Sequence, residues 1–151
     1  MALSGKLEAV IELKSPVDKI YNVFKCQSHH IPNHTPKNIQ GFQIHEGDFE
    51  TSGSVRIWNY TVEGKPGVFK ERIELDDENK TVTFHGLEGD VMQIYKIYKP
   101  VWTFKPNGEG TTLAVCAIEY EKQNESVPAP NIYLDFIVSL TKDIDDGLSK
   151  A

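Results

Sequence analysis

From about residue 38 to residue 122 the chain alternates between apolar and polar side chains in short runs. This alternation predicts β-strands, because successive side chains of a strand point to opposite faces of a sheet. The intervening turns are short and rich in glycine, proline, aspartate and asparagine, so neighbouring strands should run antiparallel. The expected strands cover residues 38–47, 54–62, 66–75, 80–88, 92–105 and 111–122.

One more strand and two short helices are expected before this series. Residues 5–14 alternate in the same way and predict a first strand. Ser15 is expected to cap a helix that has Pro16 at its first position, and apolar residues at helical spacing continue to about residue 25. Residues 27–33 are expected to form a turn or a second short helix, which ends at the prolines that follow.

A long amphipathic helix is expected at the C-terminal end. Apolar residues recur three and four positions apart over residues 132–148, and acidic and basic residues occupy the other side. The whole pattern predicts an α+β fold with a single domain over residues 1–151. In this fold a seven-stranded curved antiparallel sheet wraps around the long helix, and two short helices complete it.

Aromatic residues gather on one face of the expected sheet. They share the same parity within their strands and so can all point into one concavity. They are Trp58, Tyr60, Phe69, Phe84, Tyr98, Trp102, Phe104 and Tyr120. One helix is narrower than the sheet, so we expect a hollow, apolar cavity of the ~300–1,000 Å³ typical of small-molecule sites. A filled aromatic core is the alternative, although buried tyrosine hydroxyls need partners and therefore favour a pocket.

The charge balance restricts the partners. The chain carries 22 acidic against 16 basic residues, a net charge of −6, which disfavours nucleic acids and anionic membrane surfaces. No apolar run reaches the length of a membrane span, so no stable membrane insertion is expected. The first residues lack the basic and apolar regions of a signal peptide, so a cytoplasmic location is expected. The two cysteines, Cys26 and Cys116, are then expected to be reduced thiols rather than one disulfide.

Glu71 is the main candidate for chemistry. It alternates with Phe69 and Ile73 and should therefore face inward, where burial would raise its pKa. Such a carboxyl group could act as a general acid or base, or hold a cationic ligand. A structural pairing with Arg56, which has the inward parity on the neighbouring strand, is the alternative. If the protein is an enzyme, Glu71 with Arg56 or Tyr98 is the expected catalytic pair.

No metal or cofactor is expected. His30 and His34 have the i, i+4 spacing of a helical metal site, but Pro32 interrupts the helix that this spacing requires. No cysteine or carboxylate lies close enough in sequence to complete a ligand set. The histidines are therefore expected at the surface or at a cavity entrance.

Several segments, spread over nearly the whole chain, match one plant family. They are Ser4-Gly5-Lys6-Leu7, His45-Glu46-Gly47-Asp48, Ile57-Trp58-Asn59-Tyr60, Glu63-Gly64-Lys65, residues 76–92, Glu119-Tyr120-Glu121-Lys122 and residues 128–136. In this order and spacing they resemble the plant major latex proteins, within the birch pollen allergen and pathogenesis-related class 10 superfamily. The resemblance implies a helix-grip, START-like fold, an internal cavity for hydrophobic plant metabolites, and roles in defence, stress and development.

The loop at residues 46–53 departs from the wider superfamily. Allergen-type members carry a glycine-rich loop there that resembles a phosphate-binding loop. This chain has only two glycines, three acids and no lysine in that loop. Binding phosphate requires free backbone N–H groups and no competing anions, so neither nucleotide binding nor nuclease activity is expected.

The resemblance and the aromatic face together predict a non-enzymatic carrier or store for small hydrophobic metabolites such as hormones, sterols, flavonoids or alkaloids. The expected ligand contacts are Trp58, Tyr60, Phe69, Glu71, Phe84, Tyr98, Trp102 and Tyr120 on the sheet, Tyr133, Phe136, Ile137 and Leu140 on the final helix, and His30, which the related fold places near the cavity mouth. Uptake would need the loops around Gly47, Gly64 and Gly89 to flex, or the final helix to shift.

Some relatives of this fold are enzymes that isomerise or condense alkaloid precursors by acid/base chemistry, which is the alternative function. A third possibility, a defence-signalling interaction module with an incidental pocket, has no specific support in the sequence.

Overall fold

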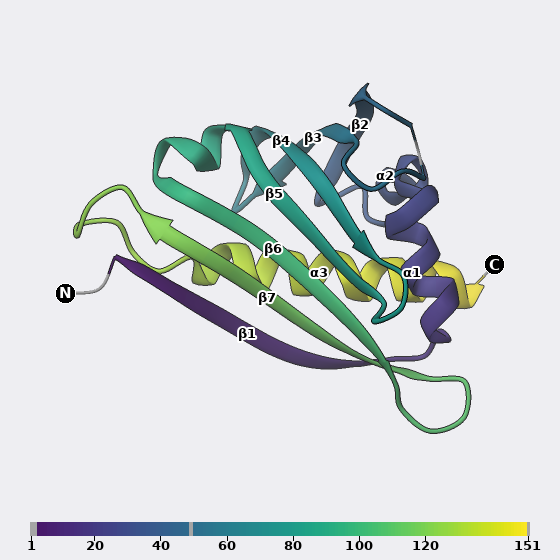
Figure 1. Ribbon diagram of the computed structural model, residues 1–151. Coiled ribbons are helices and arrows are strands. Elements are labelled where there is room, and N and C mark those ends of the chain that lie inside the picture. The colour runs from purple at the N-terminus through teal and green to yellow at the C-terminus, as the bar shows by residue number, and fades with distance from the viewer. Residues whose placement is uncertain (1–2, 49, 151) are drawn as a thin grey trace.

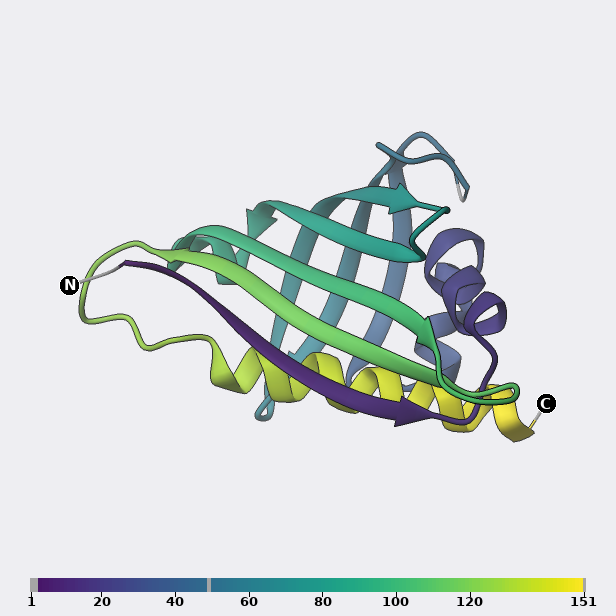
Figure 2. The ribbon, with the colours of Figure 1, turned by 60° about the horizontal axis from the view of Figure 1, so that its bottom comes forward.

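The computed structural model describes residues 3–48 and 50–150, and it contains one curved sheet that wraps around one long helix (Figures 1 and 2). The strands are β1 (Ser4–Leu13), β2 (Ile39–Glu46), β3 (Val55–Val62), β4 (Lys65–Asp76), β5 (Thr81–Gly89), β6 (Tyr95–Pro106) and β7 (Thr112–Lys122). The helices are α1 (Val17–Cys26), α2 (Ile31–His34) and α3 (Asn131–Lys150), with 3-10 turns η1 (Ser28–His30) and η2 (Asp90–Gln93).

The sheet has seven strands in the order β1-β7-β6-β5-β4-β3-β2, and every neighbouring pair is antiparallel. Strands β2 to β7 are connected in sequence order, whereas β1 lies beside β7 at the far edge. The segment with α1 and α2 therefore crosses from one edge of the sheet to the other. Figure 2 shows α3 lying in the concave side of the sheet, with α1 and α2 closing the end near the C-terminus of α3.

The predicted element order and the seven-stranded sheet are confirmed, and two local details were wrong. The strand expected from residue 92 begins at Tyr95, because residues 90–93 form η2. The N-cap of α1 is Pro16, not Ser15, and no side chain within residues 3–48 and 50–150 forms a capping hydrogen bond to this helix. The backbone of Ser15 binds elsewhere instead: its N–H donates to Asp145 of α3 at 2.9 Å, and its carbonyl accepts the hydroxyl of Thr112 at 2.6 Å.

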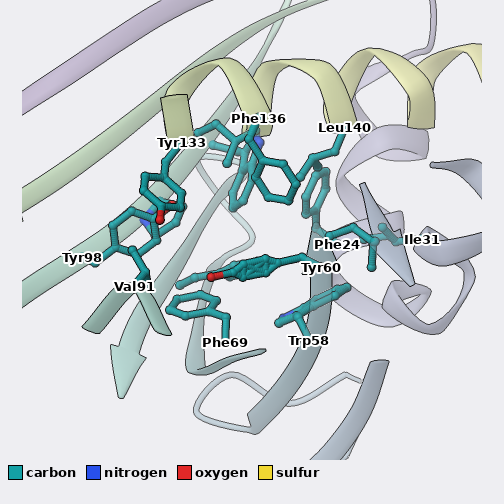
Figure 3. Close-up of a pocket in the computed structure, with 15 residues that line it drawn as sticks. Phe24, Ile31, Trp58, Tyr60, Phe69, Val91, Tyr98, Tyr133, Phe136 and Leu140 are labelled. Atoms are coloured by element: carbon teal, nitrogen blue, oxygen red, sulfur yellow. The ribbon is translucent and has the colours of Figure 1, made fainter. Parts of the chain in front are cut away.

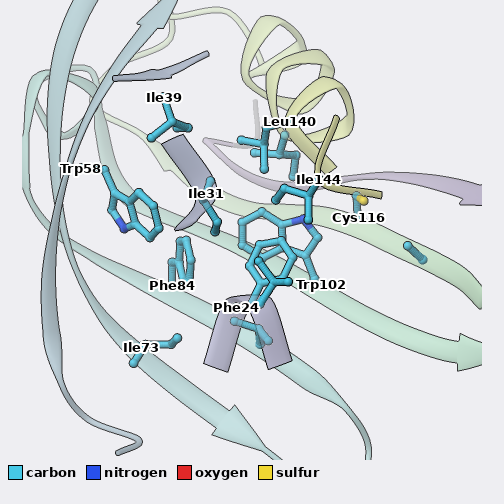
Figure 4. Packing of buried hydrophobic residues seen from close by; sticks show 14 of the residues in the cluster. Phe24, Ile31, Ile39, Trp58, Ile73, Phe84, Trp102, Cys116, Leu140 and Ile144 are labelled. Carbon is cyan, nitrogen blue, oxygen red and sulfur yellow. The ribbon is translucent and has the colours of Figure 1, made fainter. Parts of the chain in front are cut away.

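The space between α1, the sheet and the C-terminal half of α3 is filled by a dense aromatic core (Figure 4). The ring of Trp102 lies 4.8 Å, between centroids, from both Phe24 and Phe84. Its indole N–H donates to Thr141 Oγ1 at 2.9 Å, and the Thr141 hydroxyl donates in turn to the carbonyl of Ile137. These bonds fix the middle of α3 against the sheet.

Candidate ligand-binding site

A cavity of about 50 Å³ lies between the concave face of the sheet and the N-terminal half of α3 (Figure 3). Its wall is apolar or aromatic and contains no acidic, basic or histidine side chain. The lining residues are Phe24, Ile31, Ile39, Trp58, Tyr60, Phe69, Phe84, Val91, Tyr98, Pro100, Trp102, Tyr133, Phe136, Ile137 and Leu140. The cavity therefore lies where the aromatic side chains of the sheet and of α3 meet.

The cavity is far smaller than the ~300–1,000 Å³ of a typical small-molecule site, so the expectation of a roomy, hollow concavity was wrong for this conformation. The physical reason is that large side chains from both walls meet in the middle. Tyr60 packs against Phe136 with ring centroids 5.7 Å apart, and Tyr98 packs against Tyr133 at the same separation. A ligand must therefore displace side chains to enter.

Most of the expected ligand contacts line this cavity. They are Trp58, Tyr60, Phe69, Phe84, Tyr98, Trp102, Tyr133, Phe136, Ile137 and Leu140. Three others lie elsewhere: Glu71 is buried behind the wall, Tyr120 packs on Tyr95 with its hydroxyl over Gly5, and His30 is exposed on η1 beside His29. Tyr120 pairs with Tyr98 across β6 and β7, but its ring packs against Tyr95 and its hydroxyl lies over Gly5, so it does not line the cavity.

Some wall residues were not identified from the sequence. Phe24 and Ile31 close one end of the cavity from α1 and α2, and their contribution depends on where these helices rest, which spacing does not give. Tyr95 is buried although it has the outward parity of β6, because a bulge between Tyr95 and Ile97 reverses the alternation. Its ring lies 6.1 Å from that of Tyr98, and its hydroxyl donates to the carbonyl of Pro128 at 2.7 Å.

Three tyrosines of the wall differ from Tyr95 in the hydrogen bonding of their hydroxyl groups. Among the described residues, no hydrogen bond joins the hydroxyl of Tyr60, Tyr98 or Tyr133 to another protein group. Burial is the main cause that raises the pKa of each of these phenols, so all three are neutral at physiological pH. Three side chains that line the cavity thus carry neutral hydroxyl groups, although the surface of the cavity itself is almost wholly apolar.

Glu71 is fully buried, as its parity predicted, but it reaches the cavity only through Trp58. Its Oε2 accepts the indole N–H of Trp58 at 2.9 Å, and its Oε1 has no partner among the described residues. Burial raises the pKa of Glu71 to about 8, against the opposing effects of the Trp58 hydrogen bond and the charge of Arg56. The carboxyl group is therefore mainly protonated at neutral pH.

Arg56 sits opposite Glu71 in the β3–β4 register and is also fully buried. Its Nη1 donates to the carbonyl of Phe24 at 2.9 Å and to Ser28 Oγ at 2.7 Å, and its Nη2 donates to the carbonyl of Lys25 at 3.0 Å. The guanidinium thus ties the C-terminal end of α1 to the sheet. Its charge lowers the pKa of Glu71, but its hydrogen bonds serve the helix.

The loop at residues 46–53 directs two of its backbone donors to its own Asp48. Asp48 Oδ1 accepts the N–H groups of Glu50 and Thr51, and its Oδ2 accepts the Thr51 hydroxyl. These bonds hold the pKa of Asp48 below its usual value. Phe49 of this loop lies outside the described residues. The arrangement leaves a carboxylate where a phosphate would need N–H groups.

The described residues contain no group of three histidine, cysteine, aspartate or glutamate side chains placed to hold a metal ion. Cys26 and Cys116 are free thiols, and burial raises the pKa of Cys116 to about 12. Within residues 3–48 and 50–150, no helix combines the length and the apolar content that a membrane span requires.

Comparisons with known proteins agree with this fold. Residues 2–151 match the model of the pathogenesis-related protein Bet v 1 family. MLP-like protein 328 of Arabidopsis thaliana is 41% identical over 151 residues, which is the full length of both chains. A crystal structure of major latex-like protein 151 from Panax ginseng superimposes with a TM-score of 0.93 at 42% identity, covering 97% of this chain and 98% of that one.

A norcoclaurine synthase of Thalictrum flavum also superimposes, with a TM-score of 0.75 over 99% of this chain and 98% of that one. Its sequence is only 16% identical, so it shares the fold and supports no statement about activity. The family match over almost the whole chain and the high identity to two latex-type proteins agree with each other. This chain belongs to the pathogenesis-related protein Bet v 1 family, and its similarity within that family is to the major latex proteins.

Proposed function

We propose that this protein binds, stores or transports small hydrophobic plant metabolites in its internal cavity, in the cytoplasm and as part of defence and stress responses. The observation that carries the proposal is the uncharged aromatic wall under the N-terminal half of α3. Apolar walls with a few polar groups are the common form of small-molecule sites. The ligand-binding character of the family and the two free thiols, which suit a reducing compartment, support it further.

Phe136 marks the route by which a ligand would enter. It is half-buried, and it lines both the internal cavity and a groove on the surface between α3 and the β3–β4 turn. That groove is formed by Asn38, Thr61, Val62, Glu63, Ile132, Asp135 and Phe136. Phe136 therefore lies between the cavity and the surface groove, and we expect rotation of its ring to join the two spaces.

The acid/base alternative finds weaker geometric support. The wall holds tyrosine hydroxyls, whereas Glu71 lies behind Trp58. Catalysis by Glu71 would therefore require Trp58 to move aside.

Native mass spectrometry of the protein after incubation with a plant metabolite extract tests the proposal, with the extract alone as the control. A bound mass already present in the extract is the expected result and would identify the cargo. A new mass that appears only with protein would indicate catalysis and direct attention to Glu71 and the wall tyrosines. Absence of any bound small molecule would refute the carrier function.

Phe136→Ala gives a sharper test of the route. Because the ring is half-buried, we expect a loss of about 2–3 kcal/mol in unfolding free energy, less than the 3–5 of a fully buried Phe. The variant should take up larger ligands from the same extract than the wild type does. Ile132→Ala is the matched control, since Ile132 lines the surface groove but not the cavity. An unchanged ligand profile in Phe136→Ala would count against Phe136 as the barrier.

A further inference from the structure

Buried tyrosine hydroxyls ordinarily have a hydrogen-bond partner. Tyr95 follows this rule with Pro128, and Tyr21 follows it with Asp77 at 2.6 Å. Tyr98 and Tyr60 are only 5% and 7% exposed, yet among the described residues their hydroxyls bind no protein group. The hydroxyl of half-buried Tyr133 is in the same state.

These three hydroxyls belong to one group at one end of the cavity. Figure 3 shows Tyr98 and Tyr133 side by side, with Tyr60 and Phe69 next to them. The rings of Tyr98 and Tyr133 are 5.7 Å apart, and Phe69 meets Tyr98 edge-on at 5.5 Å. All four side chains line the cavity, so a ligand that displaced these rings would meet their hydroxyl groups.

The position of Tyr60 depends on a glycine in the neighbouring strand. Gly67 pairs with Tyr60 across β3 and β4, and a Cβ atom at Gly67 would lie 2.7 Å from the Tyr60 hydroxyl oxygen. The absence of a side chain at Gly67 therefore lets the ring lie flat along the sheet, with its hydroxyl end over β4.

The charges around this group indicate the kind of ligand. The cavity wall contains no cation that could pair with an anionic ligand. The carboxylates of Asp90 and Glu63 help to raise the pKa of the Tyr133 phenol, which means that they disfavour a negative charge beside it. Burial of an unpaired charge in such a wall costs far more than burial of a hydrogen-bonded neutral group.

We propose that Tyr60, Tyr98 and Tyr133 form a hydrogen-bonding site for the oxygen of a neutral ligand, such as a ketone or lactone, whose flat apolar body packs against the aromatic wall. This inference rests on the proposed carrier function and narrows its ligand class. It favours uncharged, oxygen-bearing polycyclic compounds over carboxylic acids and over plain hydrocarbons.

Three naphthalenes with substituents of nearly equal size separate these classes: 2-acetylnaphthalene, 2-isopropylnaphthalene and 2-naphthoate. Their affinities would be measured by isothermal titration calorimetry with wild type, Tyr98→Phe and the triple variant Tyr60→Phe/Tyr98→Phe/Tyr133→Phe. Tyr95→Phe is the matched control, because it removes a buried hydroxyl that points to Pro128 instead of the cavity.

The wild type should bind the ketone at least tenfold more tightly than the naphthoate. Tyr98→Phe should weaken ketone binding about 3–10-fold, the effect of one neutral hydrogen bond, and the triple variant should weaken it further. Binding of the isopropyl compound should change less than twofold in every variant. Tyr98→Phe should also keep or raise the thermal midpoint of the free protein, since its hydroxyl has no hydrogen-bond partner to lose among the described residues.

Equal ketone affinity in the wild type and the triple variant would overturn the tyrosine site while leaving the carrier function intact. Stronger binding of naphthoate than of the ketone would overturn the neutral-ligand assignment. If none of the three compounds bound and the metabolite extract also yielded no bound mass, the carrier function itself would fall, and the inference with it.

Discussion

At the scale of single residues, the buried acid Glu71 stands out because its environment favours the protonated form. Its ordinary pKa is 4.5 and its pKa in the fold is about 8, so the folded state binds more protons than the unfolded state between these values. Stability should therefore fall as pH rises from about 4.5 to 8, by roughly 3 kcal/mol at pH 7 as an upper estimate. The hydrogen bond from Trp58 persists in either form.

Glu71→Gln should remove most of this pH dependence, because glutamine imitates the protonated acid and keeps an oxygen for Trp58. We expect the unfolding free energy of the variant to equal that of the wild type near pH 5 and to exceed it at pH 8. Denaturant unfolding at several pH values checks this, with exposed Glu12→Gln as the control. If Glu71 were instead an ionised partner of Arg56, the variant would be less stable than the wild type throughout.

At the scale of elements, α1 depends on a side chain from the sheet. Arg56 reaches from β3 to two carbonyls at the end of α1 and to Ser28 of η1, so it holds the closing end of the molecule in place. The C-terminal half of α3 is held comparably, since both carboxylate oxygens of Asp145 accept backbone N–H groups, from Lys14 and Ser15. The N-terminal half of α3, with half-buried Tyr133 and Phe136, makes no such hydrogen bond to the sheet among the described residues.

Arg56→Met should cost about 3–5 kcal/mol, because it leaves two carbonyls at the end of α1 and the Ser28 hydroxyl without their charged donor. Amide hydrogen exchange should accelerate over residues 17–34 more than over the sheet. Arg72→Met is the matched control, since Arg72 is exposed on β4 and binds the carbonyl of Gly53. Equal destabilisation by both substitutions would show that Arg56 does not have this special role.

The helices and strands were predictable from the sequence, because the spacing of apolar residues along a helix or strand follows from its local backbone geometry alone. Alternation gave the strands and the inward position of Glu71, and three–four spacing gave α3. The bulge at Tyr95 was not predictable, because it reverses parity without a glycine or proline to mark it. The hydrogen bonds of Arg56 could not be predicted from the sequence either, since they depend on how α1 crosses the sheet.

At the scale of the whole molecule, the fold and the position of the cavity could be predicted, but its volume could not. The strand order follows from short antiparallel connections, and the concave face follows from the parity of the aromatic residues. Volume depends on how rings such as Tyr60 and Phe136 meet across the cavity, and a displacement of about 1 Å changes the outcome. Sequence patterns do not resolve packing at that scale.

The small volume of the cavity has a consequence for the kinetics of binding. A ligand can enter only after the wall has opened, so opening precedes association. In stopped-flow mixing with 2-acetylnaphthalene, the observed rate should level off at high ligand concentration, at the rate of opening. Phe136→Ala should raise that plateau, whereas a rate that keeps rising linearly in the wild type would mean that the cavity is already open. Because the wall is uncharged and the ligand neutral, these rates should be nearly independent of ionic strength.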